Sequence, residues 1–182
     1  MIILLKQNAN QKQVDNLTKW LKQRGFDRIT EESIRCALMD VHWPGRLEFF
    51  GNVILDGAHN EPGVKALRRY MDAWLPKEKT VLLTGMMADK DVACMTAQLA
   101  RSVRCVVATQ PAIPRAMAAD ALACAFEAQG AKVYAVANPK EALQKARELA
   151  GNDGTVLCAG SLYLIGEIRS LLRQEKEFSD VI

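Results

Sequence analysis

The chain of 182 residues is 49% hydrophobic and 25% charged, and its formal net charge is +3 at pH 7. Its length suits one sizeable core, and its composition is that of a globular protein. No apolar run approaches the roughly 20 residues of a membrane helix, and residues 1–5 lack the length and the basic flank of a signal peptide. We therefore expect a cytoplasmic protein with no membrane partner. Because Lys and Arg are scattered along the chain, nucleic acid is not an expected partner either.

The cysteine pattern argues against a metal or redox site. No C-x-x-C pair occurs, and the cysteines lie far apart in mostly apolar stretches. We expect no metal site within the chain, and we expect the thiols to be reduced and buried in a core. They are Cys36, Cys94, Cys105, Cys124 and Cys158.

Residues 1–40 are predicted to form a helical lead-in. Val14, Leu17 and Leu21 recur at helical spacing, and Gly25 suits the left-handed residue that ends a helix. Thr30 can cap a second helix, whose first turn contains acidic residues. One amphipathic hairpin cannot bury its own apolar face, so it needs the rest of the chain or a further domain.

Residues 41–182 are predicted to form an α/β domain. Five nearly unbroken apolar runs, typical of parallel strands buried on both faces, occupy residues 52–57, 80–85, 105–110, 132–137 and 155–160. Helices are predicted at residues 62–74, 91–101, 115–129, 139–150 and 162–174. Residues 46–51 can pair antiparallel with the first run as an edge hairpin. We expect an open, mostly parallel, Rossmann-like sheet of about six strands, with one antiparallel edge strand and helices on both faces.

Polar residues gather where the predicted strands end. In open α/β sheets ligands bind beyond the carboxyl ends of the strands, which selects Asp56, His59 and Asn60 after the first parallel strand and Ser161 after the last. Asn60 can cap the next helix, whose amide end favours anions. Asp56 can accept from ribose hydroxyls, and His59 can bond a phosphate or a carboxylate. The alternative is that Asp56 and Asn60 only satisfy backbone amides and that His59 is a surface side chain.

Arg46, in the stretch of residues 43–48, is a second candidate. Pro44 and Gly45 signal a turn that would hold its guanidinium, a planar fork suited to phosphate. The alternative is a turn with a surface pair between Arg46 and a glutamate. Lys90, in the loop of residues 84–91, is a weaker candidate, because a solvated turn capped by Asp91 explains that segment equally well.

Two phosphate-binding motifs are absent and a hydrolase is disfavoured. Neither G-x-x-x-x-G-K-[ST] nor G-x-G-x-x-G occurs, so the chain carries no Walker loop and no dinucleotide fingerprint. Ser161, His59 and Asp56 match a hydrolase triad by residue type. However, the serine lacks the G-x-S-x-G elbow, and the other two residues share one short turn.

Five stretches taken together resemble a known family. They are WPGRLE at 43–48, ILDGAHN at 54–60, TGMMADKD at 84–91, PRA at 114–116 and AGSLYLIGEIR at 159–169. In this order they closely resemble the carboxyl-terminal domain of folylpolyglutamate synthase and dihydrofolate synthase, within the Mur ligase superfamily. The first and last stretches favour the folate branch over the peptidoglycan-building enzymes. By this resemblance, the lead-in is the end of a preceding domain and its linker.

The resemblance implies a ligase that uses ATP and magnesium to join L-glutamate to a folate or dihydropteroate carboxylate. The reaction would pass through an acyl phosphate. It places the Walker loop and most magnesium ligands in an amino-terminal domain that this chain lacks, so the chain alone is expected to be inactive. By matched motif, Arg46 contacts ATP phosphates, Asp56 holds the ribose or links the domains, and Ser161 lies near the glutamate. His59 orients the phosphate or the incoming glutamate, and Asn60 is a weaker nucleotide contact because capping already explains it.

One departure from the family pattern keeps an alternative open. Glu61 follows the asparagine of the D-G-A-H-N stretch, where the family usually has proline, and Pro62 comes second. The change puts an extra negative charge beside an anion site. The alternative is a stand-alone binding or regulatory module that kept the fold and lost catalysis.

Overall fold

The chain divides into two compact units, Met1–Trp43 and Pro44–Ile182. The structure is a computed structural model that describes residues 11–26, 28–41 and 43–179. Residues 1–10 of the predicted lead-in lie outside the described residues. That the first unit is the end of a preceding domain stays a prediction.

The first unit contains two helices, α1 (Gln11–Lys22) and α2 (Glu31–Asp40). Gly25 has a φ of 86°, the left-handed conformation predicted for the end of the first helix. Thr30 caps α2 as predicted, because its hydroxyl accepts the Ser33 amide while the Ser33 hydroxyl accepts the Thr30 amide. The helical lead-in is therefore confirmed as secondary structure over its described residues.

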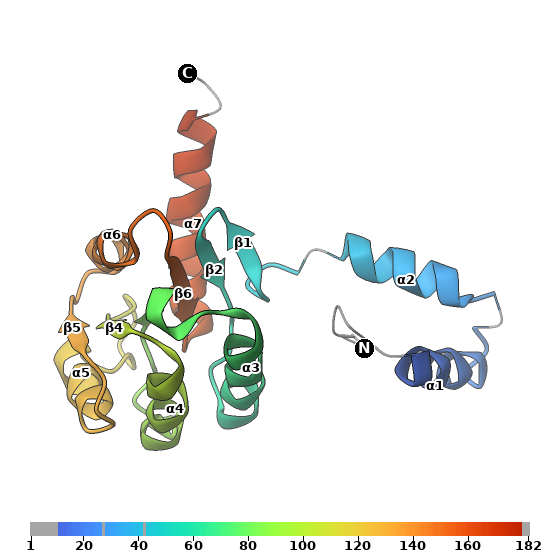
Figure 1. Cartoon of the computed structure of the whole chain (residues 1–182), viewed down its shortest axis with the longest axis horizontal. Coiled ribbons are helices and arrows are strands. Elements are labelled where there is room, and N and C mark those ends of the chain that lie inside the picture. Colours follow the sequence, from blue (N-terminus) through green and yellow to red (C-terminus); the bar gives the residue numbers. More distant parts are fainter. Residues whose placement is uncertain (1–10, 27, 42, 180–182) are drawn as a thin grey trace. The chain divides into compact units, whose positions relative to one another are not determined.

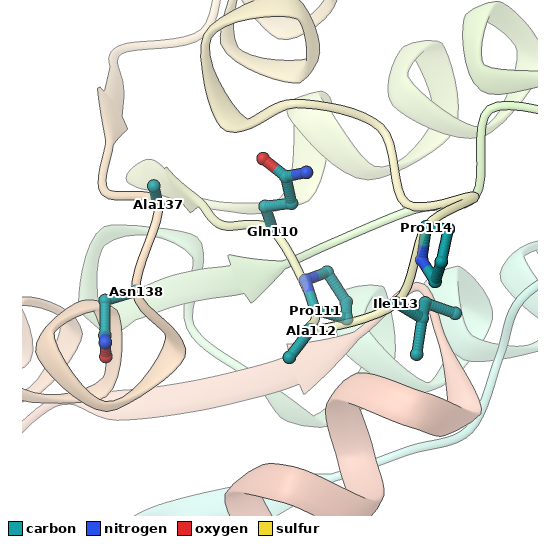
Figure 2. A pocket seen from close by; sticks show the side chains of 7 residues that line it. All are labelled: Gln110, Pro111, Ala112, Ile113, Pro114, Ala137 and Asn138. Atoms are coloured by element: carbon teal, nitrogen blue, oxygen red, sulfur yellow. The ribbon is translucent and has the colours of Figure 1, made fainter.

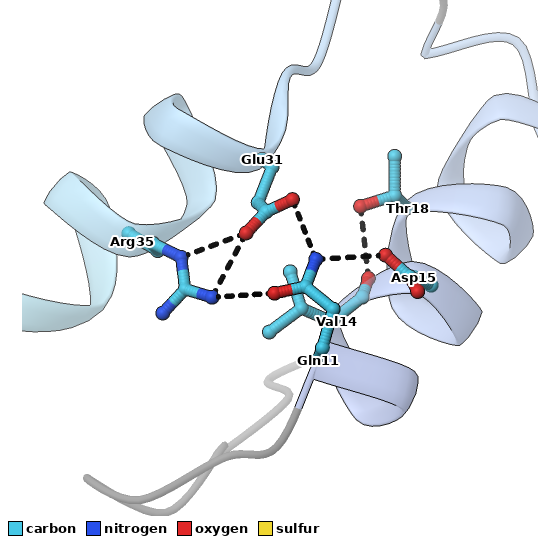
Figure 3. A network of polar contacts seen from close by, with 6 residues as sticks. All are labelled: Gln11, Val14, Asp15, Thr18, Glu31 and Arg35. Carbon is cyan, nitrogen blue, oxygen red and sulfur yellow. Dashed lines mark hydrogen bonds and ion pairs between the residues drawn. The ribbon is translucent and has the colours of Figure 1, made fainter.

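Side chains of α1 and α2 are joined by a polar network that Figure 3 shows from close by. Arg35 donates to Glu31 and to the Gln11 carbonyl oxygen, and the Gln11 amide donates to Glu31 and Asp15. All four side chains are well exposed or half-exposed, and exposed pairs of this kind contribute little to stability. The network orients the two helices but cannot replace an apolar core.

Six strands of the second unit form one sheet in the order β1-β2-β6-β3-β4-β5. The edge strand β1 runs antiparallel to β2, and all other neighbours are parallel, as predicted. The bounds are β1 Glu48–Phe50, β2 Val53–Leu55, β3 Thr80–Thr84, β4 Cys105–Ala108, β5 Val133–Ala135 and β6 Thr155–Ala159.

Helices cover both faces of this sheet, as the unbroken apolar strands predict. On one face, where Figure 1 shows α3, α4 and α5, Ile54, Leu82 and Leu157 join one buried cluster. Val53 and Leu55, which flank Ile54 in β2, point to the other face, into a second buried cluster with α6 and α7. The bounds are α3 Glu61–Trp74, α4 Val92–Leu99, α5 Ala119–Glu127, α6 Pro139–Ala150 and α7 Leu162–Ser179.

Three predicted helices differ from the observed ones, and one of them, α7, continues to Ser179, beyond the predicted end at residue 174. The stretch predicted as residues 115–129 is helical only from Ala119, because its first residues pair with another loop: the Met117 amide donates to the Met86 carbonyl, and the Arg115 carbonyl accepts from Ala88. The stretch predicted as residues 91–101 forms α4 and then the 3₁₀ turn η2 (Ala100–Ser102). A second 3₁₀ turn, η1 (Lys77–Lys79), precedes β3.

The cysteines correct one expectation. Cys105 and Cys158 are buried in the core as predicted, and burial raises the pKa of the Cys158 thiol. Cys36 and Cys124 are exposed and Cys94 is half-buried, so burial of all five was wrong. Apolar neighbours in sequence do not decide which helix face a residue occupies. In the part of the chain that the structure describes, no helix has the length and apolarity to cross a membrane.

Candidate functional site

The predicted strand-end site lies where β6 runs between β2 and β3. Helices α3 and α4, which follow β2 and β3, cover one face, whereas α7, which follows β6, covers the other. Neighbouring strands whose connections leave toward opposite faces mark the switch point at which open sheets bind ligands. We call the loops that meet there the crest: residues 44–47, 56–60, 84–91, 114–116 and 160–163.

Asp56 follows β2 and is only 9% exposed. Its Oδ2 accepts the Leu47 amide at 3.1 Å and its Oδ1 accepts the Ala58 amide at 2.9 Å. Burial raises the pKa of this carboxyl, while the two amides and the nearby Arg46 guanidinium oppose the rise. The two bonds tie the turn that contains Arg46 to the end of β2, so Asp56 organises the crest.

Arg46 lies at the end of β2, in a turn with a demanding backbone. Its Nη1 lies 3.2 Å from where a Cβ of Gly57 would be, so the guanidinium covers the Gly57 backbone. Gly45 has a φ of 69° and its carbonyl accepts the Gly57 amide at 2.7 Å. Leu47 has a φ of 45°, a left-handed conformation that costs a side-chain-bearing residue of order 1–3 kcal/mol. Such strain is retained where the surroundings hold the backbone in place.

The alternative of a surface pair between Arg46 and a glutamate is not what the structure shows. Glu48 pairs instead with Arg169 of α7, whose Nε lies 2.8 Å from Oε2. Burial raises the pKa of Glu48, but hydrogen bonds from Arg169 and the Gly45 amide outweigh it, so the pKa lies below its usual range. Arg46 is exposed at the crest, and no carboxylate within the described ranges forms an ion pair with it.

His59 is half-buried and its tautomer follows from one contact. Its Nδ1 lies 2.7 Å from the Gly57 carbonyl oxygen. A carbonyl only accepts, so Nδ1 carries the proton and donates it. The neutral ring therefore presents Nε2 as an acceptor, and the protonated ring presents it as a donor. His59 and Arg46 both contact Gly57, which brings the two predicted phosphate-facing groups to one backbone position.

Asn60 caps α3 as predicted. Its Oδ1 accepts the Gly63 amide at 2.9 Å, and Glu61 and Pro62 occupy the first turn. Glu61 at this position interacts favourably with the positive end of the helix dipole. The helix therefore begins directly after the cap although glutamate stands where the family has proline.

Substitution Asn60→Ala is expected to lower the free energy of unfolding by about 1 kcal/mol, because an orphan amide of the first turn loses its acceptor. Asn60→Ser is expected to keep most of the stability, since serine also caps. Urea unfolding measures both, with Asn138→Ala, which removes the equivalent cap of α6, as the matched control. If Asn60→Ser kept stability but weakened nucleotide binding, Asn60 would contact the ligand as well as cap the helix.

Ser161 and Lys90 have bonding partners within their own loops. Ser161 is 1% exposed and its hydroxyl accepts the Tyr163 amide at 3.1 Å, so it supports the start of α7. Lys90 forms a 3.7 Å ion pair with Asp89, and Asp91 caps α4 through the Cys94 amide. A contact of Ser161 with glutamate stays a prediction.

Arg115 and Tyr163 are crest residues that the sequence interpretation did not single out. The Arg115 guanidinium lies over the Tyr163 ring, 5.3 Å from its centroid, and donates to the Tyr163 hydroxyl at 3.1 Å. No carboxylate in the described part of the chain forms an ion pair with Arg115. Arg115 belongs to the PRA stretch and Tyr163 to the AGSLYLIGEIR stretch, and only the tertiary fold brings them together.

The crest does not contain a hydrolase triad. Asp56 is bonded to two backbone amides and His59 to a backbone carbonyl, so the described residues hold no aspartate–histidine bond that could orient the imidazole. The Ser161 hydroxyl is bonded within its own turn. The arrangement gives the hydrolase hypothesis no support.

A shallow pocket of about 540 Å³ lies beside the crest, between the loops that follow β4 and β5. Figure 2 shows the residues that line it, among them Pro111, Pro114 and the α6 cap Asn138. Its lining contains no charged side chain. Within residues 11–26, 28–41 and 43–179, no group of three or more His, Cys, Asp or Glu is placed to hold a metal.

The open sheet and its crest define an α/β domain that presents two arginines and a histidine at a switch point, which suits anionic ligands. Residues 45–162 match the family described as the Mur ligase, glutamate ligase domain. The chain belongs to this family of Mur ligase carboxyl-terminal domains, in its folylpolyglutamate and dihydrofolate synthase branch. The resemblance inferred from the five stretches is thus confirmed.

Two curated relatives illustrate the similarity. A probable bifunctional folylpolyglutamate synthase/dihydropteroate synthase from Halobacterium salinarum is 37% identical over 146 residues, which are 78% of this chain and 18% of that protein. The dihydrofolate synthase/folylpolyglutamate synthase of Bacillus subtilis is 30% identical over 158 residues, which are 85% of this chain and 36% of that protein. The chain therefore spans only a minor part of these relatives.

Solved structures agree with the fold. Mycobacterium tuberculosis folylpolyglutamate synthase, solved with ADP and AMPPCP, matches 80% of this chain and 36% of its own with a TM-score of 0.71 and 29% identity. E. coli FolC, solved with DHPP and ADP, matches 96% of this chain and 41% of its own with a TM-score of 0.79. Its identity is 22%, so it supports the fold alone.

Proposed function

We propose that this chain is the carboxyl-terminal part of an ATP-dependent ligase that joins L-glutamate to a folate or dihydropteroate carboxylate. The observation that carries the proposal is the crest, where Arg46 and His59 meet over Gly57 beside the start of α7. Family membership supports it, as does the similarity to synthases whose structures contain adenine nucleotides. In this reaction ATP phosphorylates the folate carboxylate to an acyl phosphate, the glutamate amine attacks it, and phosphate leaves.

Arg46 and His59 are proposed to act on the phosphoryl group. Arg46 offers a cation for which the described residues supply no ion pair, and such a cation suits the charge that develops on a transferring phosphoryl group. His59 offers Nε2 beside it, as a hydrogen-bond donor when the ring is protonated. Asp56 is proposed to hold the Arg46 turn in place, and a link to the ribose or to the preceding domain would use the remaining lone pairs of its oxygens.

Arg115 is proposed to bind a carboxylate of the incoming glutamate. It contacts Tyr163 in the first turn of α7, whereas Arg46 lies near Leu162 of the same turn. The Tyr163 ring restrains the guanidinium, which lowers the entropy lost on binding. Ser161 accepts the Tyr163 amide at the start of this turn, and His59 bonds the carbonyl of Gly57, which lies against Leu162, so both remain proposed neighbours of the glutamate.

The crest fits a nucleotide phosphate but not a complete nucleotide site. Arg46, His59 and the amide end of α3 are groups that bind phosphate oxygens. Magnesium would neutralise phosphate charge, and we propose that the preceding domain supplies the Walker loop and most of the magnesium ligands. The partner of the crest is then that ATPase domain. We propose that the protein is cytoplasmic.

Arg115→Met is expected to raise the KM for glutamate about 10-fold to 100-fold with little change in the KM for ATP, because one charge-assisted hydrogen bond is worth about 1.5–3 kcal/mol. The measurement is steady-state ligation by the chain joined to an ATPase domain. Arg101→Met is the matched control, since Arg101 lies in η2, which precedes β4 at the amino end of the strands, whereas the crest lies at their carboxyl end. Equal increases in both KM values would place Arg115 outside the glutamate site.

A coupled assay of ADP release tests the proposed function. The chain is fused to the amino-terminal region of the B. subtilis synthase, in place of that enzyme's own carboxyl-terminal domain. We expect ADP release that requires both the folate substrate and glutamate. A stand-alone regulatory module predicts a folded fusion whose ADP release does not respond to glutamate.

A further inference from the structure

One face of α7 lies along the crest. Leu162, Ile165 and Arg169 are separated by three and four residues, so they share a face of the helix. Leu162 Cδ2 lies 2.6 Å from the Cβ position of Gly57, and Ile165 Cγ2 lies 2.8 Å from that of Gly45. Neither glycine has room for a side chain, because α7 packs directly against the backbone on both sides of Arg46.

Arg169 continues this face to the other end of the Arg46 turn. Its Nε lies 3.0 Å and 2.8 Å from the two carboxylate oxygens of Glu48. Glu48 Oε2 also accepts the Gly45 amide at 2.8 Å. The side chains of the pair are only 22% and 20% exposed, so it is better shielded from water than the ion pairs on the surface helices.

The Arg46 turn is thus held from two directions. Asp56 and Gly57 hold Leu47 and Gly45 from the side of β2. Glu48 of β1 holds the Gly45 amide and is itself oriented by Arg169 of α7. Leu47 is strained in its left-handed conformation, so we expect the turn to open more easily when such bonds are lost.

We propose that Arg169 and Glu48 are positioning residues that hold the Arg46 turn in its ligand-binding geometry. The inference rests on the proposed function only for its effect on catalysis. The contact between Glu48 and Arg169 does not depend on that function. It joins the first of the five family-like stretches, which contains Glu48, to the last, which contains Arg169, 121 residues further along the chain. Arg169 acts through Glu48 and the Gly45 amide and touches no substrate.

The first test is amide hydrogen exchange in the complete chain, followed by NMR. In Arg169→Met, we expect exchange of the Gly45 amide to accelerate about tenfold, since local opening sets the exchange rate. Arg147→Met is the matched control. It removes an ion pair from α6 to Glu175 of α7 that contacts no crest loop, so Gly45 exchange should stay as in the unsubstituted chain.

Two further variants separate positioning from a simple tether between β1 and α7. The charge swap Glu48→Arg with Arg169→Glu restores an ion pair but leaves the Gly45 amide without its acceptor. We expect it to regain thermal stability relative to Arg169→Met while Gly45 exchange stays fast. Glu48→Gln keeps a carbonyl acceptor for that amide, and we expect it to retain most of the protection. If the charge-swapped protein does not fold, the Glu48→Gln variant still tests whether the acceptor at this position protects the Gly45 amide.

The second readout is glutamate ligation by the chain joined to an ATPase domain. Arg169→Met is expected to lower kcat at least about tenfold, because misplacement of a charge-stabilising group by about 1 Å costs up to about 100-fold. Unchanged Gly45 protection in Arg169→Met, or full recovery of protection in the charge swap, would overturn the inference. Failure of the proposed function is distinguishable, since it would abolish ligation in the unsubstituted chain while the exchange result stood.

Discussion

Substitution of Arg46 by methionine, in the chain joined to an ATPase domain, is expected to lower kcat for glutamate ligation by about 100-fold to 1,000-fold. Loss of one preorganised donor to a developing charge has this magnitude. The guanidinium is exposed over Gly57 at the end of β2 and is free of ion pairs within the described ranges, so its charge is available to a phosphate. Single-turnover kinetics with saturating ATP measures the effect.

The controls for this variant separate charge from shape and from folding. Arg46→Lys keeps the charge and loses the planar fork, so an intermediate rate is expected. The unfolding free energy of Arg46→Met should stay within about 0.5 kcal/mol of the unsubstituted chain, as for other exposed side chains. A rate within threefold of the unsubstituted enzyme would remove Arg46 from the active site.

Substitution Asp56→Asn is expected to lower the free energy of unfolding by about 1–3 kcal/mol at neutral pH, because an asparagine carbonyl can accept only one of the two amides and its NH₂ group then faces the other. The amides of Leu47 and Ala58 compete for that single acceptor. Because Leu47 is in a left-handed conformation, its exchange is expected to accelerate most. Urea unfolding and amide exchange measure the two effects.

Asp91→Asn is a matched control for this substitution, and the pH dependence is a second check. Asp91 accepts one amide as the cap of α4, which asparagine does equally well.

Because burial raises the pKa of Asp56, the folded chain binds this proton more tightly than the unfolded chain. The unsubstituted chain should therefore gain stability relative to Asp56→Asn as the pH falls through the folded pKa toward 3.8, the usual value. Equal stability of both proteins at every pH would show that Asp56 does not hold the turn.

Local sequence signals were sufficient for the sheet and for most helix starts. Strands such as β3 and β6 are continuous apolar runs, because both of their faces are covered. Asn60 and Thr30 cap helices through bonds that span three residues, which sequence spacing encodes directly. The late start of α5 was not predictable in this way, since it depends on a bridge between Met87 and Ala116.

The candidate site was predictable in its position but not in its connections. The strand-end rule selects Asp56 and His59, yet their bonds to Leu47 and Gly57 follow from how two loops meet. The Glu48–Arg169 pair spans 121 residues and needs the packing of α7 on the sheet. Long-range contacts of this kind arise from tertiary structure, and one sequence carries no local signal for them.

The mass of the folate product shows whether this chain supports the ligation of glutamate. The fusion of this chain with the amino-terminal region of the B. subtilis synthase is incubated with ATP, magnesium, glutamate and a folate or dihydropteroate substrate. We expect a product heavier by one glutamate residue, formed with one ADP, and its loss in Arg46→Met. A folded fusion that binds ATP and the folate substrate but yields no glutamylated product would show that the chain is not the glutamate ligase domain of such an enzyme.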